Sequence, residues 1–453
     1  MSRVSRFTTA RVALAVCALA TSAVVVVGQS LAAIVGMVAT AIALGSYWSM
    51  VVAEERRPSL TLRNVVIAIA VVLGAAMTTV PRESGDVWSY TIYGRMVAVH
   101  HASPYRNLPD DYPNDPMFGF VSSTWRHTGS VYGPAFTALS AGVSPVIGDS
   151  ALRARLLYQT LAAASVVGAL VLVWRRTRSV SGIAWLGLHP LIAIYVVNGG
   201  RNDAIIGLAI LGAALLAERS RSRAAGLLSG VGAAIKATVL LTSAGLGIWT
   251  WRRRGSRHAV TLAATTVVVV VGAYAAAGGP VALGPLEHAS TQFSRASIWS
   301  VLPRLGLPSV STATAMVLTT AIVVLCLYRQ TNDDAGQAAL AGPAAFLLAT
   351  PYVLPGYLGW VLPTAALRQD RAQARIIALQ GTVLVGAYAI FRHRPPGSIG
   401  DALARWSTLL AAMIGVFLLV SYIRSATSPR ERADRFGSAS TRDPKSILAR
   451  SNR

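Results

Sequence analysis

Two charged side chains lie in or beside strongly apolar stretches. A charge in such a place costs free energy, so its presence suggests a function. Asp86 follows the apolar stretch 64–80 by a few residues, with aromatic residues close behind it. At a membrane surface such a carboxylate can act as a general base toward a hydroxyl group. Lys236 lies inside the apolar stretch 230–241, where it would suit a lipid phosphate. Two alternatives remain open. Asp86 could be a solvated acid in an interfacial aromatic belt, and the side chain of Lys236 could extend to the membrane interface.

A short polar turn, residues 198–203, is a third candidate for chemistry. It brings Arg201, Asn202 and Asp203 together between two apolar stretches. These side chains either form part of a substrate site or make ordinary turn contacts, with Asp203 capping the helix that follows. Arg295, in a later polar stretch, either meets a phosphate or is a surface arginine.

The sequence gives little support for a metal or nucleotide site. Its first long polar stretch contains acidic and histidine residues, but it lacks a glycine-rich calcium loop and the HExxH and CxxC spacings of zinc sites. These residues are Asp110, Asp111, Asp115, His100, His101 and His127. We interpret the acids as loop residues and expect no metal and no cofactor. The absence of a P-loop argues against ATP-driven transport.

The composition is that of a membrane protein. Of the 453 residues, 53% are hydrophobic and 13% are charged, whereas an average soluble domain has about 25% charged residues. The formal net charge of +23 comes largely from arginine clusters between apolar runs, such as 175–178 and 252–257. Such clusters are typical of cytoplasmic loops rather than of a nucleic-acid-binding face. The sequence therefore predicts an all-α polytopic membrane protein that does not bind nucleic acid.

The alternation of basic loops and apolar runs predicts how the chain is threaded. Residues 1–424 form a single transmembrane domain with about 14 membrane-crossing segments, some of them short. Residues 81–133 form its main extracytoplasmic loop. Residues 425–453 form a disordered cytoplasmic tail.

Two apolar stretches do not fit the pattern of ordinary spans. Residues 134–148 contain a proline near their end, which predicts a re-entrant or interfacial helix. Residues 224–251 have basic residues at both ends, so they must cross the membrane an even number of times. Because they cannot make two full spans, we expect two half-helices that meet near Lys236.

Several short segments occur in a fixed order between about residues 80 and 365. They are Gly85–Tyr90 with Tyr93–Arg95, Ser103–Tyr105, Ser130–Pro134, Asn198–Asp203, Ala233–Lys236, and Leu354–Tyr357 with Trp360 and Leu362–Pro363. In this order the segments resemble GT-C fold glycosyltransferases, and more narrowly the actinobacterial polyprenol-phosphomannose-dependent α-1,6-mannosyltransferases. Two positions depart from the pattern of that family, because Arg201 stands where a histidine is usual and Gly356 where a tryptophan is common.

The resemblance implies a GT-C-type helical bundle with a long first outer loop, and it implies roles for individual residues. Asp86 would be the catalytic base that takes the proton of the acceptor hydroxyl. Lys236 and Arg201 would hold the donor phosphate, and we predict Arg295 as a further phosphate-binding residue. The substrate-binding residues would be Tyr90, Arg95, Asn202, Asp203, Tyr132 and Tyr357.

The reaction that the resemblance implies is an inverting transfer of mannose, with α-1,6 linkage, at the outer face of the cell membrane. The partners would be a polyprenyl phosphomannose donor, membrane lipids and a glycolipid acceptor such as a phosphatidylinositol mannoside or lipomannan. Two other classes of function remain open: a transporter or flippase of a lipid-linked sugar, and a structural protein of cell-envelope assembly. The long outer loop with an acid near the membrane favours the enzyme over a transporter.

Overall fold

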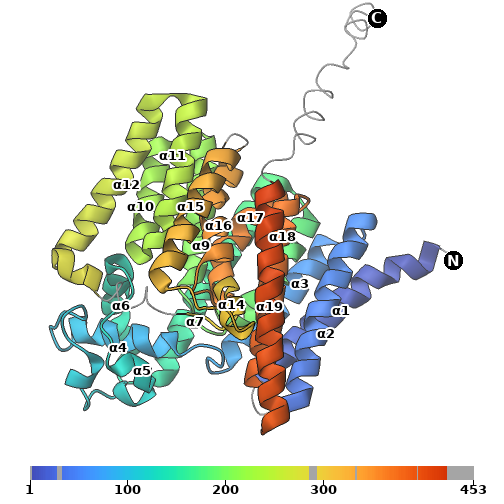
Figure 1. The fold of residues 1–453 in the computed structure, drawn as a ribbon, viewed down its shortest axis with the longest axis horizontal. Helices are drawn as coiled ribbons and strands as arrows, with labels where there is room; N and C mark the ends of the chain where they lie inside the picture. Colours follow the sequence, from blue (N-terminus) through green and yellow to red (C-terminus); the bar gives the residue numbers. More distant parts are fainter. Residues whose placement is uncertain (1–2, 28–32, 285–292, 332–333, 395, 426–453) are drawn as a thin grey trace, which may run out of the picture.

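Helices are the dominant element of the described fold. The computed structural model describes residues 3–27, 33–284, 293–331, 334–394 and 396–425, and within these ranges it contains helices and no strand. Figure 1 shows long helices side by side, with a layer of short helices and loops at one end. The predicted all-α polytopic class is confirmed. The predicted tail, residues 425–453, lies outside the described residues beyond Ser425.

Seven of the described helices are long and apolar enough to cross a membrane. They are α1 (Arg3–Val27), α2 (Ala33–Arg56), α7 (Ala151–Thr177), α12 (Ser256–Ala276), α15 (Thr312–Gln330), α18 (Ala372–Arg392) and α19 (Ser398–Ser425). In α12 only Leu262 and Thr266 are buried, although the helix is strongly apolar. An apolar helix that buries so little of itself in protein is suited to contact with lipid.

Shorter helices fill the space between the long ones. They are α3 (Leu62–Thr78), α6 (Pro134–Ile147), α8 (Val180–Gly187), α9 (Asp203–Glu218), α10 (Ser222–Ile235), α11 (Leu240–Arg254) and α16 (Ala335–Ala349). Almost every residue of α16 is buried, so this helix lies inside the bundle. Helix α6 is the short helix predicted over residues 134–148, and it contains Pro145. The count of about 14 crossing segments stays a prediction.

The predicted pair of half-helices is present around Lys236. Helix α10 ends at Ile235, a single turn η5 (Ala237–Val239) follows, and α11 begins at Leu240. Lys236 itself has φ −150° and ψ 116°, which is extended backbone that cannot continue a helix. The break therefore leaves helix ends and one lysine side chain at the same place, an arrangement tolerated in a membrane only where protein or a cavity surrounds it.

The polar segment before α6 is hydrogen-bonded to the end of α10 at this break. The Gly133 amide donates to the Ile235 carbonyl oxygen at 2.9 Å, which satisfies one of the free carbonyls at the end of α10. A Cβ atom on Gly133 would lie 2.2 Å from the Ala234 carbonyl oxygen. Only glycine allows this approach, and it brings the neighbouring Tyr132 close to the Lys236 turn.

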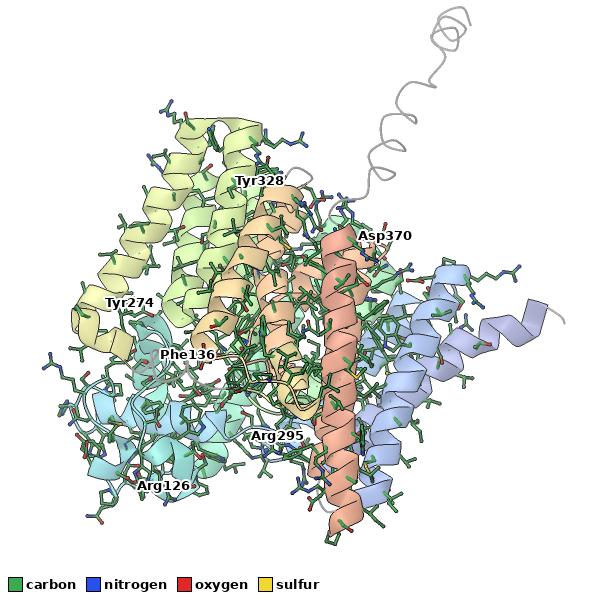
Figure 2. The ribbon with its side chains drawn as sticks, in the orientation of Figure 1. Arg126, Phe136, Tyr274, Arg295, Tyr328 and Asp370 are labelled. Atoms are coloured by element: carbon green, nitrogen blue, oxygen red, sulfur yellow. The ribbon has the colours of Figure 1, made fainter. Side chains whose placement is uncertain are left out.

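The layer at one end of the bundle comes from the first long polar stretch. It contains α4 (Asp86–Ala98), η2 (Pro109–Asp111), η3 (Phe118–Phe120) and α5 (Ser123–Arg126). In Figure 2, Arg126 and Arg295 lie toward this end, whereas Tyr328 and Asp370 lie at the opposite end. The bundle thus has two distinct ends, and the elements of residues 81–133 gather at one of them.

A buried ion pair holds this layer in shape. The Asp115 side chain is fully buried, and Arg95 Nε lies 2.9 Å from both of its carboxylate oxygens. His100 Nε2 lies 2.7 Å from Asp115 Oδ2, and Arg95 also pairs with Asp149 at 3.0 Å. Asp115 is a loop residue, as interpreted from the sequence, and its carboxylate is the centre of a structural network.

We expect Asp115→Asn to destabilise the protein by about 3 kcal/mol, because it leaves a buried guanidinium without its main partner. Burial by itself would raise the pKa of the Asp115 carboxyl, but hydrogen bonds from the Met117 amide, Arg95 and His100 outweigh it and lower that pKa. The network's contribution should therefore be complete above the ordinary pKa near 3.8 and be lost as the pH falls through the lowered pKa. Thermal unfolding of both proteins in detergent between pH 3 and pH 7 measures this, and a constant difference across the range would contradict it.

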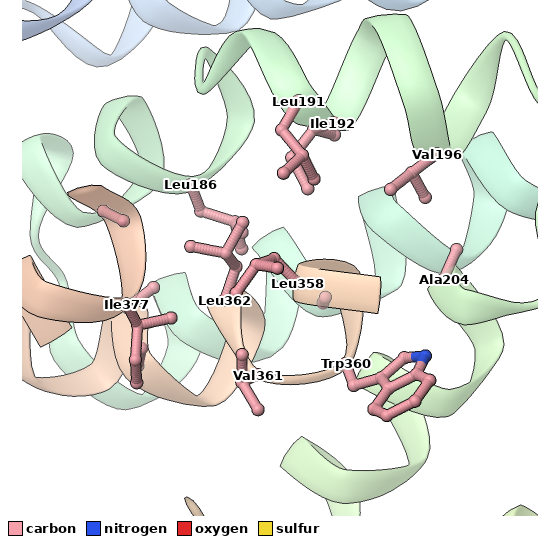
Figure 3. Packing of buried hydrophobic residues seen from close by; sticks show 14 of the residues in the cluster. Leu186, Leu191, Ile192, Val196, Ala204, Leu358, Trp360, Val361, Leu362 and Ile377 are labelled. Carbon is pink, nitrogen blue, oxygen red and sulfur yellow. The ribbon is translucent and has the colours of Figure 1, made fainter. Parts of the chain in front are cut away.

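The remaining elements are short, and the last three of them make up the late hairpin, residues 355–368. They are η4 (Ile192–Val197), η6 (Gly279–Leu283), η7 (Ile298–Ser300), α14 (Val301–Arg304), η8 (Pro355–Trp360), α17 (Leu362–Ala365) and η9 (Ala366–Arg368). Figure 3 shows Leu358 and Leu362 of this hairpin close to Leu186, and Trp360 turned toward the start of α9. A rigid apolar contact between the hairpin and the neighbouring helices thus supports the polar residues described next.

Candidate active site

Four charged side chains form one chain of ion pairs. Asp86 Oδ2 lies 2.9 Å from Arg201 Nη2, and Arg201 Nη1 lies 3.7 Å from Asp203 Oδ2. Asp203 Oδ1 in turn lies 3.0 Å from Lys236 Nζ. Acid and base alternate along this chain, so each charge has an opposite neighbour and the cluster is neutral overall. The sequence prediction had these residues serving one site, and the structure brings all four together.

The two ends of the ion-pair chain are accessible and its middle is not. The side chains of Asp86 and Lys236 are 20% and 24% exposed, whereas those of Arg201 and Asp203 are 6% and 2% exposed. A substrate can therefore reach the carboxylate of Asp86 at one end and the ammonium group of Lys236 at the other. The shielded pair between them fixes the distance and orientation of the two ends.

Asp86 is held by the segment in front of it. Arg392 pairs with the Glu83 carboxylate at 2.7 Å and donates to the Arg82 and Glu83 carbonyl oxygens at 2.9 Å each. The Arg82 amide donates to Asn198 Oδ1 at 3.0 Å. Asp86 is then the first residue of α4, where the helix dipole favours a negative charge.

The turn that carries Arg201 depends on Gly200. Gly200 has φ +56°, a left-handed conformation that glycine adopts without strain, and a Cβ there would lie 2.7 Å from the Val87 side chain. Burial by itself would lower the pKa of the Arg201 guanidinium, but Asp86 and Asp203 reverse this effect and raise that pKa. Arg201 is therefore a permanent cation in the middle of the cluster.

An aromatic wall stands beside Lys236. Its Nζ lies 4.0 Å from the Tyr357 ring centroid and 4.4 Å from the Trp360 ring centroid, and the two rings stack at 4.9 Å. Trp360 Nε1 also donates a hydrogen bond to Asp203. Cation–π contacts of this kind hold the ammonium group without neutralising it. Trp360 was not among the residues predicted for the site, although its position close behind Tyr357 in the family segment could have indicated it.

The other aromatic residues form the floor of the site. The Tyr132 hydroxyl donates to Asp86 Oδ1 at 3.4 Å, and the Tyr90 hydroxyl accepts from the Asn202 amide at 3.3 Å. The Tyr90 and Tyr132 rings meet edge to face at 4.7 Å. The Asn202 side-chain nitrogen is buried and, among the described residues, has no hydrogen-bond partner. A buried amide without a partner is a group that a ligand can satisfy.

Two predicted residues lie elsewhere. Arg95 is engaged by Asp115 and Asp149, and it does not join the chain of ion pairs in the part of the protein that the structure describes. Arg295 is exposed, and its guanidinium lies 4.3 Å from the Phe391 ring centroid. The geometry gives Arg95 a structural task, and Arg295 as a phosphate ligand stays a prediction. No group of three or more potential metal ligands lies together within the described residues.

Comparisons with known proteins point in one direction. Residues 5–253 match the family model "Alpha-(1->6)-mannopyranosyltransferase, N-terminal domain", and residues 131–387 match "Glycosyltransferase family 87". The chain is 29% identical over 371 residues to alpha-(1->6)-mannopyranosyltransferase A of Mycobacterium tuberculosis, which covers 72% of this chain and 69% of that protein. It is also 29% identical over 170 residues to the protein of the same name from Corynebacterium glutamicum, covering 36% and 34% of the two chains. No solved structure matches the chain significantly.

Proposed function

The chain belongs to the alpha-(1->6)-mannopyranosyltransferase family, and from this premise we propose that it transfers mannose from a polyprenyl phosphate to a hydroxyl group of a glycolipid. Its membership of glycosyltransferase family 87 and its apolar helices make it a membrane mannosyltransferase. The lipid donor, the inversion at the anomeric carbon, the α-1,6 linkage and the position of the site at the outer face of the cell membrane are parts of the proposal.

The observation that carries the proposal is the chain of ion pairs with an accessible acid at one end and an accessible cation at the other. Transfer from a sugar phosphate needs a base for the incoming hydroxyl and positive charge for the departing phosphate. Asp86 supplies the first and Lys236 supplies the second. Arg201, between them, can assist either partner.

The proposed step is a single displacement. The acceptor oxygen forms a bond to the anomeric carbon while the bond from that carbon to the phosphate oxygen breaks. The proton of the acceptor hydroxyl passes to the Asp86 carboxylate, and the departing polyprenyl phosphate keeps the electron pair. Lys236 and Arg201 stabilise the negative charge that grows on the phosphate, so the step needs no general acid. A β-linked donor would give an α-linked product.

The remaining residues of the site would orient the sugar. The side-chain nitrogen of Asn202, which has no hydrogen-bond partner in the described part of the chain, can donate to a sugar hydroxyl. The stacked rings of Tyr357 and Trp360 offer an apolar surface next to the cation that holds the phosphate. Ligand sites commonly combine aromatic walls with a few well-placed polar groups in this way.

The direct test is transfer by the purified protein. Full-length protein in lipid nanodiscs is incubated with radiolabelled polyprenyl phosphomannose and a panel of acceptors that includes phosphatidylinositol mannosides and lipomannan. The proposal expects label in an acceptor as a base-stable glycoside. Movement of the donor across the bilayer of proteoliposomes, with no labelled product on any acceptor, would instead support a flippase of the lipid-linked sugar.

The outer position of the site predicts the topology of the layer built from residues 81–133. Arg106 is exposed in this layer, Arg219 is exposed in the basic loop between α9 and α10, and both native cysteines are buried. In intact cells, Arg106→Cys should react with a membrane-impermeant maleimide and Arg219→Cys should react only after lysis. The reverse labelling pattern would contradict an extracytoplasmic site.

A further inference from the structure

Gly356 lies against the guanidinium of Arg201. A Cβ atom at Gly356 would lie 2.2 Å from Arg201 Nη1, 2.8 Å from Cδ and 3.0 Å from Cζ. All three nearest atoms thus belong to one side chain, the central cation of the ion-pair chain. Gly356 is itself buried in η8, directly before the Tyr357 ring that faces Lys236.

The backbone does not require glycine at this position. The glycines with positive φ are Gly148, Gly200, Gly255, Gly278, Gly279, Gly306 and Gly397 among the described residues, and Gly356 is not one of them. Any residue could therefore adopt the backbone conformation of Gly356. What its missing side chain provides is space, and Arg201 fills that space.

A second glycine contact, between η8 and helix α9, provides the contrast. A Cβ at Gly207 would lie 2.2 Å from the Gly359 carbonyl oxygen, so Gly207 lets helix α9 approach the backbone of η8. That contact is between two rigid parts of the fold. At Gly356 the neighbour is the far end of a long, flexible side chain, which could be displaced without unfolding the protein.

We propose that Gly356 is a positioning residue whose missing side chain admits the Arg201 guanidinium between Asp86 and Asp203. The expected effect on catalysis rests on the proposed function. The pairing of Gly356 with Arg201 rests only on the contacts between them. Adding a methyl group at 356 expels the guanidinium from its place. Asp86 then loses its 2.9 Å partner, and the donor phosphate loses a fixed cation next to Lys236.

The test is a double-mutant cycle in full-length protein. Gly356→Ala should fold with a melting temperature close to that of the wild type, and should weaken both turnover and binding of a sugar-free polyprenyl phosphate by about tenfold, the effect of one charge-assisted hydrogen bond. In the Arg201→Ala background the same substitution should change either quantity by less than about twofold, because there is no guanidinium left to displace. Gly74→Ala is the matched control, since a Cβ at Gly74 meets nothing within 4 Å.

Two results would overturn the pairing. In the first, Gly356→Ala lowers binding and turnover by the same factor in the wild-type and Arg201→Ala backgrounds. In the second, the single variant Gly356→Ala binds and turns over like the wild type. If Gly356→Ala unfolds instead, restored melting in the double variant with Arg201→Ala supports the pairing, and continued unfolding overturns it. The binding cycle needs no transferase activity. A wild-type protein that forms no mannosyl product but shows the non-additive binding would contradict the proposed function and leave the pairing intact.

Discussion

Asp86→Asn should leave the protein folded and able to bind a polyprenyl phosphate, but should lower turnover by about a hundredfold or more. The hydroxyl of a sugar acceptor has a pKa far above neutral, so it attacks poorly until a base takes its proton in the transition state. The carbonyl oxygen of asparagine can still accept the hydrogen bond from Arg201 while its amide group donates to the Tyr132 hydroxyl, and asparagine has nearly the shape of aspartate. It cannot accept the proton. The loss should therefore appear in kcat and much less in the affinity for the lipid phosphate.

Asp111→Asn provides the control for this substitution. Asp111 lies in the same layer of the protein, where its carboxylate accepts a hydrogen bond from the Leu108 amide at 2.8 Å, and asparagine can keep that bond. We expect near-normal turnover. Asp115 is unsuitable as a control because its replacement breaks a buried ion pair. Full activity of Asp86→Asn together with an inactive Asp203→Asn would mean that the base had been assigned to the wrong carboxylate.

Local sequence signals predicted the parts of the fold that depend on local chemistry. Basic residues at both ends of a 28-residue apolar stretch, 224–251, require an even number of crossings, and this predicted the break between α10 and α11 at Lys236. The short length and internal proline of residues 134–148 likewise predicted α6. In both cases the thickness of the bilayer limits how often an apolar stretch of given length can cross it.

Contacts between distant parts of the chain could not be predicted in the same way. Nothing near Asp115 in the sequence indicates that Arg95, on a helix twenty residues earlier, buries its guanidinium against that carboxylate. The Asp203–Trp360 hydrogen bond joins residues 157 positions apart. The resemblance supplied the members of the site, but their alternation in charge, and the space that Gly356 leaves for Arg201, depend on packing that only the three-dimensional structure contains.

Lys236→Met should raise the KM for the polyprenyl phosphate donor by roughly 30- to 100-fold, the effect of losing a charge-assisted contact with a phosphate. Methionine keeps most of the length and apolar stem of lysine, so it can still fill the space beside the Tyr357 and Trp360 rings, although the cation–π contacts of the ammonium group are lost. Lys236→Arg keeps the charge and should retain most of the donor affinity. Initial rates measured over a range of donor concentrations separate KM from kcat.

A purely structural role for Lys236 predicts a different outcome. Substitution of its partner, Asp203, distinguishes the two roles. Removal of Lys236 leaves the buried carboxylate of Asp203 with Arg201 at 3.7 Å as its remaining cation, so part of any defect could come from an unbalanced charge. Asp203→Asn removes that charge while its carbonyl oxygen can still accept from Trp360. If Lys236 only neutralises Asp203, the double variant Lys236→Met/Asp203→Asn should recover both melting temperature and donor affinity. If Lys236 holds the phosphate, the double variant should recover its melting temperature while the KM for the donor stays high, because the ammonium group at the open end of the site is still missing.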